Sequence, residues 1–141
     1  MSAVVFVDTN ILIYAHDADA GLKRERSIES MRQLWNADQG RLSVQVLQEF
    51  YVNVTRKLAT PVATSTARDV VTAYGAWIRE ATTVDTVVRA TQIAEMAQIS
   101  FWDGLIVASA EQMGAAQIYS EDLNDGQTIA GIVIVNPLIS R

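Results

Sequence analysis

The stretch AVVFVDTN, residues 3–10, indicates how the chain folds. Its first five residues are a short apolar, β-branched run, which is typical of a strand buried inside a sheet. Asp8 follows where that strand ends, and the segment ILIYAHD after it predicts a short helix. A strand that leads directly into a helix is the repeating unit of a parallel sheet.

Segments with helical spacing alternate with short apolar runs along the rest of the chain. Such alternation predicts an α/β fold, with a central parallel sheet covered by helices on both faces. The polar segment EDLNDGQ, residues 121–127, is predicted to be a loop. Strands are predicted over 41–44, 116–120 and 131–137, and helices over 21–40, from Val46 to Pro61, over 64–78 with Thr64 or Ser65 as N-cap, and over 83–98 and 102–114.

Length and composition predict one domain that spans residues 1–141, since 50% of the 141 residues are hydrophobic. No apolar run reaches the roughly 18–20 residues that cross a bilayer, so no membrane association is expected. The N-terminus lacks the basic region and cleavage site of a signal peptide. The chain has no cysteine, which excludes disulfides, zinc–thiolate sites and a thiol nucleophile. We therefore expect a cytoplasmic protein.

The net charge of −5 is unevenly distributed along the chain. Residues 1–89 hold ten basic and ten acidic residues, whereas residues 90–141 hold six acids and one base. This distribution argues against a simple basic module for nucleic acids. It suits a surface that binds a cation or a basic protein partner.

Four acids stand out, and each has an ordinary structural interpretation. Asp8 could cap the helix that follows it. Asp103 lies three residues after Ser100, which is the spacing of a capping box. Glu49 falls opposite the apolar stripe of its predicted helix, beside Gln45, where a solvated side chain is expected. Asp122 could stabilise a turn.

Three of these acids share a predicted location that the structural roles do not explain. Asp8 and Asp122 follow two predicted parallel strands, and Asp103 begins a helix that can face the same rim of the sheet. Ligands of open parallel sheets bind at this rim. Carboxylates gathered there repel one another, and a divalent cation would relieve the repulsion. Oxygen ligands alone favour Mg²⁺ or Mn²⁺ over zinc, and such sites serve phosphoryl chemistry.

A family resemblance points the same way. The segments VVFVDTNILIYAHD, LQEFY, SFWDGLIVASA and IYSEDLNDGQTIAGIVIVNP occur in the order of the PIN domain. From Val4 to Pro137 the chain resembles the VapC-type toxin ribonucleases in particular. The resemblance implies a three-layer α/β/α sandwich and an endoribonuclease toxin that depends on Mg²⁺ or Mn²⁺.

The resemblance also assigns roles to individual residues. It implies that Asp8, Glu49, Asp103 and Asp122 are the catalytic acids, with Asp8 and Asp103 as the principal metal ligands. Asn10 and Ser120 match polar positions that orient the acids or contact the substrate phosphate.

Partners follow from the resemblance as well. It implies an RNA substrate, a cognate antitoxin protein and a homodimer, and it leaves transfer, ribosomal and messenger RNA open. The acidic C-terminal third agrees with a basic inhibitor segment. The candidate bases for contacting RNA are Lys23, Arg24, Arg26, Arg56 and Lys57.

Three alternatives are weighed against this interpretation. A receiver-like signalling domain also places acids at the rim, but it needs a lysine after a late strand, and none follows Lys57. A PIN fold kept for binding alone would lack one of the acids, and all four are present. A PIN nuclease outside any toxin–antitoxin pair stays open, and a short upstream reading frame would distinguish the two.

Overall fold

Strand β1 (Val5–Val7) lies inside a five-stranded sheet with the order β2-β1-β3-β5-β4. The structure is a computed structural model that describes residues 3–139. Strands β2, β1, β3 and β5 are parallel, and β4 pairs antiparallel with β5 at one edge. The other strands are β2 (Gly40–Arg41), β3 (Gln117–Tyr119), β4 (Thr128–Ile129) and β5 (Ile132–Val135).

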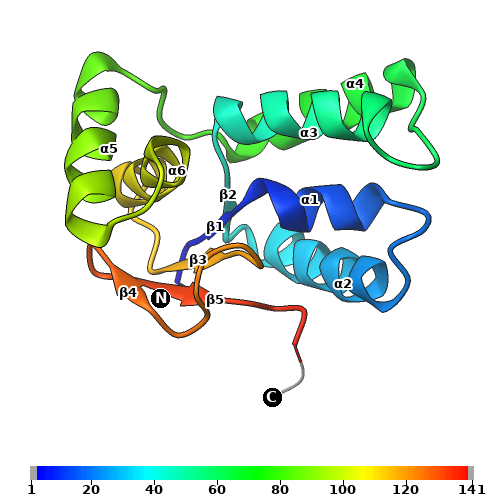
Figure 1. Ribbon diagram of the computed structural model, residues 1–141. Coiled ribbons are helices and arrows are strands. Elements are labelled where there is room, and N and C mark those ends of the chain that lie inside the picture. The colour runs from blue at the N-terminus through cyan, green and yellow to red at the C-terminus, as the bar shows by residue number, and fades with distance from the viewer. Residues whose placement is uncertain (1–2, 140–141) are drawn as a thin grey trace.

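Helices flank the sheet (Figure 1). The pair α5 and α6 lies on one side, the pair α1 and α2 on the other, and α3 packs beside α1 with α4 against it. The predicted α/β arrangement of a sheet between helices is therefore confirmed. The helices are α1 (Thr9–His16), α2 (Leu22–Ala37), α3 (Val44–Arg56), α4 (Thr64–Tyr74), α5 (Val84–Ala97) and α6 (Phe101–Gln112), and a 3-10 turn (Gly75–Trp77) follows α4.

The centre of the core is the strand pair β1 and β3. All three residues of β1 are buried, as expected for a parallel strand that is covered on both faces. Ile118 of β3 and Ile134 of β5 are fully buried beside it, and Phe50 of α3 is fully buried in the same core. Each such side chain stabilises the fold by roughly 1.5–3 kcal/mol, which holds the ends of the strands in place.

Helix α6 is held unusually close to α5. A Cβ atom added to Gly104 would lie 2.6 Å from the carbonyl oxygen of Ala90, so only glycine permits this approach. The segment from Gly104 to Ala110 is buried throughout. The close packing fixes the N-terminal turn of α6, where Asp103 lies.

Two sequence-based expectations were wrong near helix starts, the end of the second strand before α3 and the N-cap of α4. The second strand ends at Arg41 and not at residue 44, because Ser43 caps α3 by accepting a hydrogen bond from the Val46 amide. Helix α3 therefore begins at Val44. The N-cap of α4 is Ala63, which offers no side-chain bond, and not Thr64 or Ser65.

The sheet is mostly parallel, as expected, and one antiparallel strand lies at its edge. Strand β4, two residues long, was not predicted at all, and it runs antiparallel to β5. Gly131 has a φ of +80° in the tight turn between the two strands, a conformation that favours glycine. Between residues 3 and 139, no helix has both the length and the hydropathy needed to span a bilayer.

Candidate active site at the rim of the sheet

The parallel pairing of β1 and β3 brings Asp8 and Ser120 together. Val7 pairs with Tyr119, so the residues that follow these two lie side by side where the strands end. The Asp8 amide donates to the Tyr119 carbonyl at 2.9 Å, and the Ser120 hydroxyl donates to Asp8 Oδ2 at 2.9 Å. The chain thus places an acid and a hydroxyl at the rim.

Asp8 is a buried carboxylate with a perturbed pKa. Its side chain is only 6% exposed, and Oδ1 accepts a bond of 2.8 Å from the Thr9 amide, so it caps α1 as expected. Burial raises its pKa from 3.8 to about 6, and the charges of Asp122 and Asp103 contribute in the same direction. The hydrogen bonds from Ser120 and Thr9 oppose part of this rise.

Asn10 links the two strand ends. Its Nδ2 donates to Asp122 Oδ2 at 3.1 Å and to Asp8 Oδ2 at 3.3 Å. Its Oδ1 accepts a bond of 3.0 Å from the Glu121 amide, which fixes the orientation of the side-chain amide. Ser120, which is fully buried, accepts from the amides of Asp122 and Leu123 at 3.1 and 3.2 Å. Both residues therefore shape the rim around the acids.

Asp103 contributes to its helix cap only through its backbone. The Ser100 hydroxyl accepts from the Asp103 amide at 3.0 Å, as the capping spacing predicted. Among the described residues, the Asp103 carboxylate does not accept a return bond from the Ser100 amide. The half-buried carboxylate is therefore available, and its charge acts on Asp8.

Glu49 joins the site through a neighbour of Asp8. It is exposed on α3, as its position opposite the apolar stripe predicted, but its Oε1 accepts a bond of 3.0 Å from the Thr9 hydroxyl. Gln45, expected on the same solvated face, is instead buried, and its Nε2 donates to the Trp102 carbonyl at 3.2 Å. This bond ties α3 to the first turn of α6. Sequence reasoning missed both Thr9 and Gln45.

The donor set fits a hard divalent cation, with few protein ligands. In the part of the chain from residue 3 to residue 139, no three acidic or histidine side chains converge closely enough to enclose an ion by themselves. Mg²⁺ commonly uses one or two carboxylates and keeps several waters, so a full cage is not required. Asp8 carries a burial cost for its negative charge, and Asp103 and Asp122 increase it. A cation at this point would offset the burial of the Asp8 charge and its repulsion by Asp103 and Asp122.

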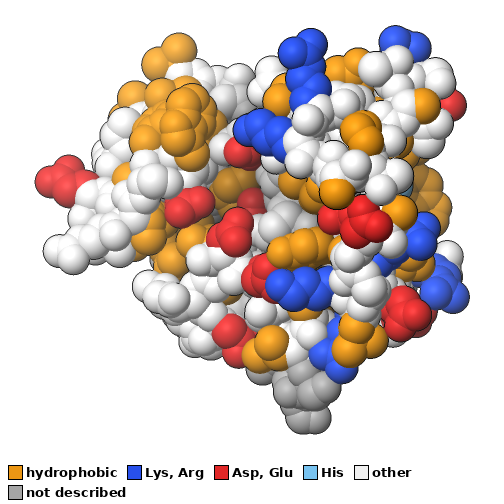
Figure 2. Space-filling view, turned by 45° about the vertical axis from the view of Figure 1, so that its right-hand side comes forward, with side chains coloured by type: hydrophobic (Ala, Val, Ile, Leu, Met, Phe, Trp, Pro, Cys, Tyr) orange, Lys and Arg blue, Asp and Glu red, His pale blue; other side chains and the backbone are white. Residues whose placement is uncertain are grey.

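One face of the molecule is hollowed. Figure 2 shows Asp and Glu side chains gathered about a hollow between two raised parts of the molecule, with Lys and Arg mainly on one of them. Lys23, a candidate for contacting RNA, is paired with Glu121 at 2.8 Å.

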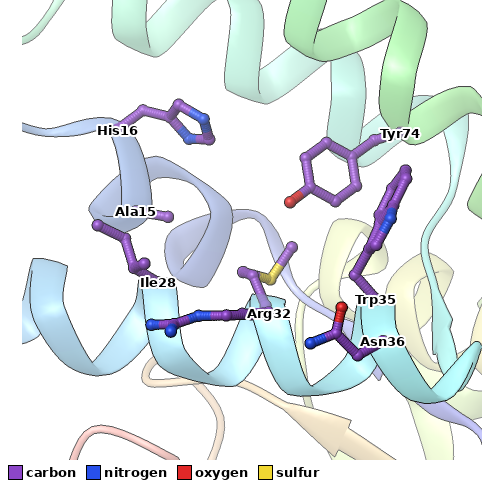
Figure 3. Close-up of a pocket in the computed structure, with 8 residues that line it drawn as sticks. Ala15, His16, Ile28, Arg32, Trp35, Asn36 and Tyr74 are labelled. Atoms are coloured by element: carbon purple, nitrogen blue, oxygen red, sulfur yellow. The ribbon is translucent and has the colours of Figure 1, made fainter.

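A separate pocket of about 290 Å³ lies between α1, α2 and α4 (Figure 3). His16 and Tyr74 enter it from α1 and α4, above Arg32 and Asn36 of α2, and its lining contains no acid. His16, the only histidine of the chain, bonds through Nδ1 to the Leu12 carbonyl at 3.0 Å. The histidine therefore belongs to this pocket and not to the acid site.

Comparison with protein families agrees with the geometry. The family model of the PIN domain matches residues 5–124, a segment that contains every residue of the rim described above. The chain belongs to the PIN-domain family. A search of curated proteins found no match to this PIN domain.

Solved structures share the fold of this PIN domain at low sequence identity. FitAB bound to an IR36 DNA fragment matches with 18% identity and a TM-score of 0.73, covering 98% of each chain. DNA-bound VapBC from Salmonella typhimurium matches with 21% identity and a TM-score of 0.62, covering 94% of this chain and 97% of that one. VapC20 of Mycobacterium tuberculosis, a toxin that cleaves the sarcin-ricin loop, matches with 20% identity and a TM-score of 0.60, covering 84% and 89%.

Proposed function

We propose that this PIN domain is an endoribonuclease that depends on Mg²⁺ or Mn²⁺ and acts as the toxin of a toxin–antitoxin pair. PIN-domain proteins are nucleases and generally use divalent metals. The observation that carries the proposal is the buried Asp8 carboxylate, whose pKa is raised by burial and by the charges of Asp103 and Asp122. Charge of one sign concentrated at a strand-end rim is what a catalytic cation would neutralise.

Asp8 and Asp103 would hold the cation, and Glu49 and Asp122 would complete the site directly or through water. When bound, the cation would activate water and stabilise the departing oxygen of a phosphodiester. Ser120 and Asn10 orient the oxygens of Asp8, and Asn10 also orders Asp122.

The acidic rim repels the phosphates of an RNA strand, so RNA binding next to it needs contacts other than ion pairs. Trp102 immediately precedes Asp103 and is 62% exposed, with its ring held edge-on against Phe101 at 5.0 Å. Aromatic rings of this kind stack on unpaired bases regardless of sequence. We therefore propose that the Trp102 ring stacks on an RNA base next to the scissile phosphate.

Support for a protein partner comes from the similar structures, since FitAB and VapBC are complexes. A basic side chain from an antitoxin would complement the acids, and a homodimer is the proposed assembly. Co-expression with the neighbouring short reading frame should yield a complex with reduced nuclease activity. Recovery of free, fully active protein would instead favour a PIN nuclease outside such a pair.

The proposal is tested by expressing the protein without its partner. Growth should arrest, and purified protein should cleave RNA with Mg²⁺ or Mn²⁺ but not with EDTA. Asp8→Asn should abolish both effects, because the amide keeps capping ability but loses the charge. Asp69→Asn, at an exposed position of α4, is the matched control and should stay active. Cleavage by a folded Asp8→Asn protein would remove the assigned mechanism.

A further inference from the structure

Glu121 lies between Ser120 and Asp122, and its side chain is bound by two other elements. Its Oε1 accepts a bond of 2.5 Å from the Tyr14 hydroxyl on α1. Its Oε2 is paired with Lys23 Nζ on α2 at 2.8 Å. The segment after β3 is thus attached to both helices on that side of the sheet.

The two partners of Glu121 also contact each other. Lys23 Nζ lies 5.0 Å from the centroid of the Tyr14 ring, within the range of a cation–π contact. Three contacts therefore join Tyr14, Lys23 and Glu121 pairwise. We call these three residues the rim clamp.

The rim clamp is connected to the acids through one amide. The Glu121 backbone N–H donates to Asn10 Oδ1 at 3.0 Å, and the other end of the Asn10 amide donates to Asp122 and Asp8. Displacement of Glu121 would free Asn10 to rotate. Both carboxylates would then lose a donor that fixes their direction.

We propose that the rim clamp is a set of positioning residues, which hold Asn10 and Asp122 in the orientation that binds the catalytic cation. The proposal rests on the metal-dependent function given above. None of the three residues is assigned as a ligand.

Substitution of Lys23 distinguishes a positioning role from a purely electrostatic effect on cation binding. A positive charge near a cation site weakens cation binding, so its removal alone should tighten the binding of Mn²⁺. If Lys23 acts by positioning, its removal should weaken binding. Tyr14→Phe changes no charge, and only positioning predicts an effect there.

Mn²⁺ affinity of the full chain, measured by titration followed by electron paramagnetic resonance, tests the rim clamp. Tyr14→Phe and Lys23→Met should each weaken binding by about tenfold, the lower end of the range for residues that orient metal ligands. Lys23→Arg should keep most of the affinity. Arg68→Met, which removes a positive charge from an exposed position of α4, and Tyr51→Phe, which removes a hydroxyl from α3, should leave the Mn²⁺ affinity unchanged.

A double variant tests whether the residues act as one unit. Tyr14→Phe combined with Glu121→Ala should bind Mn²⁺ no more weakly than Glu121→Ala alone, since both remove the same link. Melting in EDTA verifies that each variant is folded. Additive losses would overturn the clamp, as would an unchanged or tighter affinity in folded Lys23→Met. A wild type that binds no Mn²⁺ would remove the proposed metal site itself, whereas binding equal in all variants would remove only the clamp.

Discussion

The Ser120 hydroxyl donates its proton to Asp8 Oδ2 across 112 residues of sequence, at a distance of 2.9 Å. The Ser120 hydroxyl oxygen also accepts hydrogen bonds from two backbone amides, those of Asp122 and Leu123. One buried hydroxyl therefore satisfies three groups, and the amides of Asp122 and Leu123 both depend on it as an acceptor.

Ser120→Ala should destabilise the fold strongly, although it removes only one oxygen atom. It leaves two backbone N–H groups without their acceptor and Asp8 with one donor fewer, so we expect a loss of about 1–3 kcal/mol in the free energy of unfolding. Urea denaturation measures it. Ser109→Ala is the matched control, since the buried Ser109 hydroxyl has no partner among the described residues, and its removal should be neutral or stabilising. Equal effects at the two positions would contradict the assigned network.

Asp8 should make the stability of the metal-free protein depend on pH. Its pKa is 3.8 unfolded and about 6 folded, so the folded state holds a proton that the unfolded state releases. The contribution of Asp8 to the free energy of unfolding is therefore greatest below about pH 4 and falls as the pH rises to about 6. Above about pH 6 it no longer changes with pH. A shift of about two units corresponds to about 3 kcal/mol.

Asp8→Asn should lack this dependence. In EDTA, the unfolding free energy of the variant minus that of wild type should therefore rise between pH 4 and pH 6 and then stay constant. Urea titrations across this range measure the difference. A difference that is flat with pH would mean that Asp8 does not carry the burial cost assigned to it.

Asp103→Asn should separate a metal ligand from a helix cap. Removing the charge relieves repulsion of Asp8, whereas losing charge at a helix N-terminus costs roughly 0.3–1 kcal/mol. We expect the variant to melt at or above wild type in EDTA. Mg²⁺ at ten times Kd should stabilise wild type by about 1.4 kcal/mol and the variant much less. A variant that melts lower in EDTA yet responds equally to metal would make Asp103 a cap alone.

Trp102→Ala should weaken RNA binding without affecting the fold. In an Asp8→Asn background that prevents cleavage, affinity for a single-stranded oligonucleotide should fall by about 1–3 kcal/mol, the usual value of one stacked base. Trp102→Phe should keep part of the affinity. The control is Met96→Ala, a change at a residue of α5 that is 66% exposed. Fluorescence anisotropy measures all four proteins, and equal affinities would remove Trp102 from the substrate path.

The position of Asp8 and Asp122 at the rim could be predicted from the sequence, because two apolar runs determine it. Once β1 and β3 are strands in one parallel sheet, Asp8 and the segment with Ser120 and Asp122 must emerge at the same edge. The cap of α6 was equally local, since Ser100 and Asp103 are three residues apart. Short-range rules suffice for both.

Contacts between different elements were not predictable in this way. Helical periodicity places Glu49 on a polar face, but it does not say that Thr9 lies against that face, or that Gln45 is buried by α6. The rim clamp combines residues from two helices and a loop. Strand β4 was missed because two residues leave no period to recognise.

The short outer strands have a consequence for how the protein behaves in solution. Strands β2 and β4 stand at the two edges of the sheet, and each has only two residues. Exposed edges of long strands invite other chains to add to them, and short edges offer few free amide and carbonyl groups for such growth. The sheet therefore offers few sites for the strand addition that begins amyloid-like aggregation, even in a chain that is half hydrophobic.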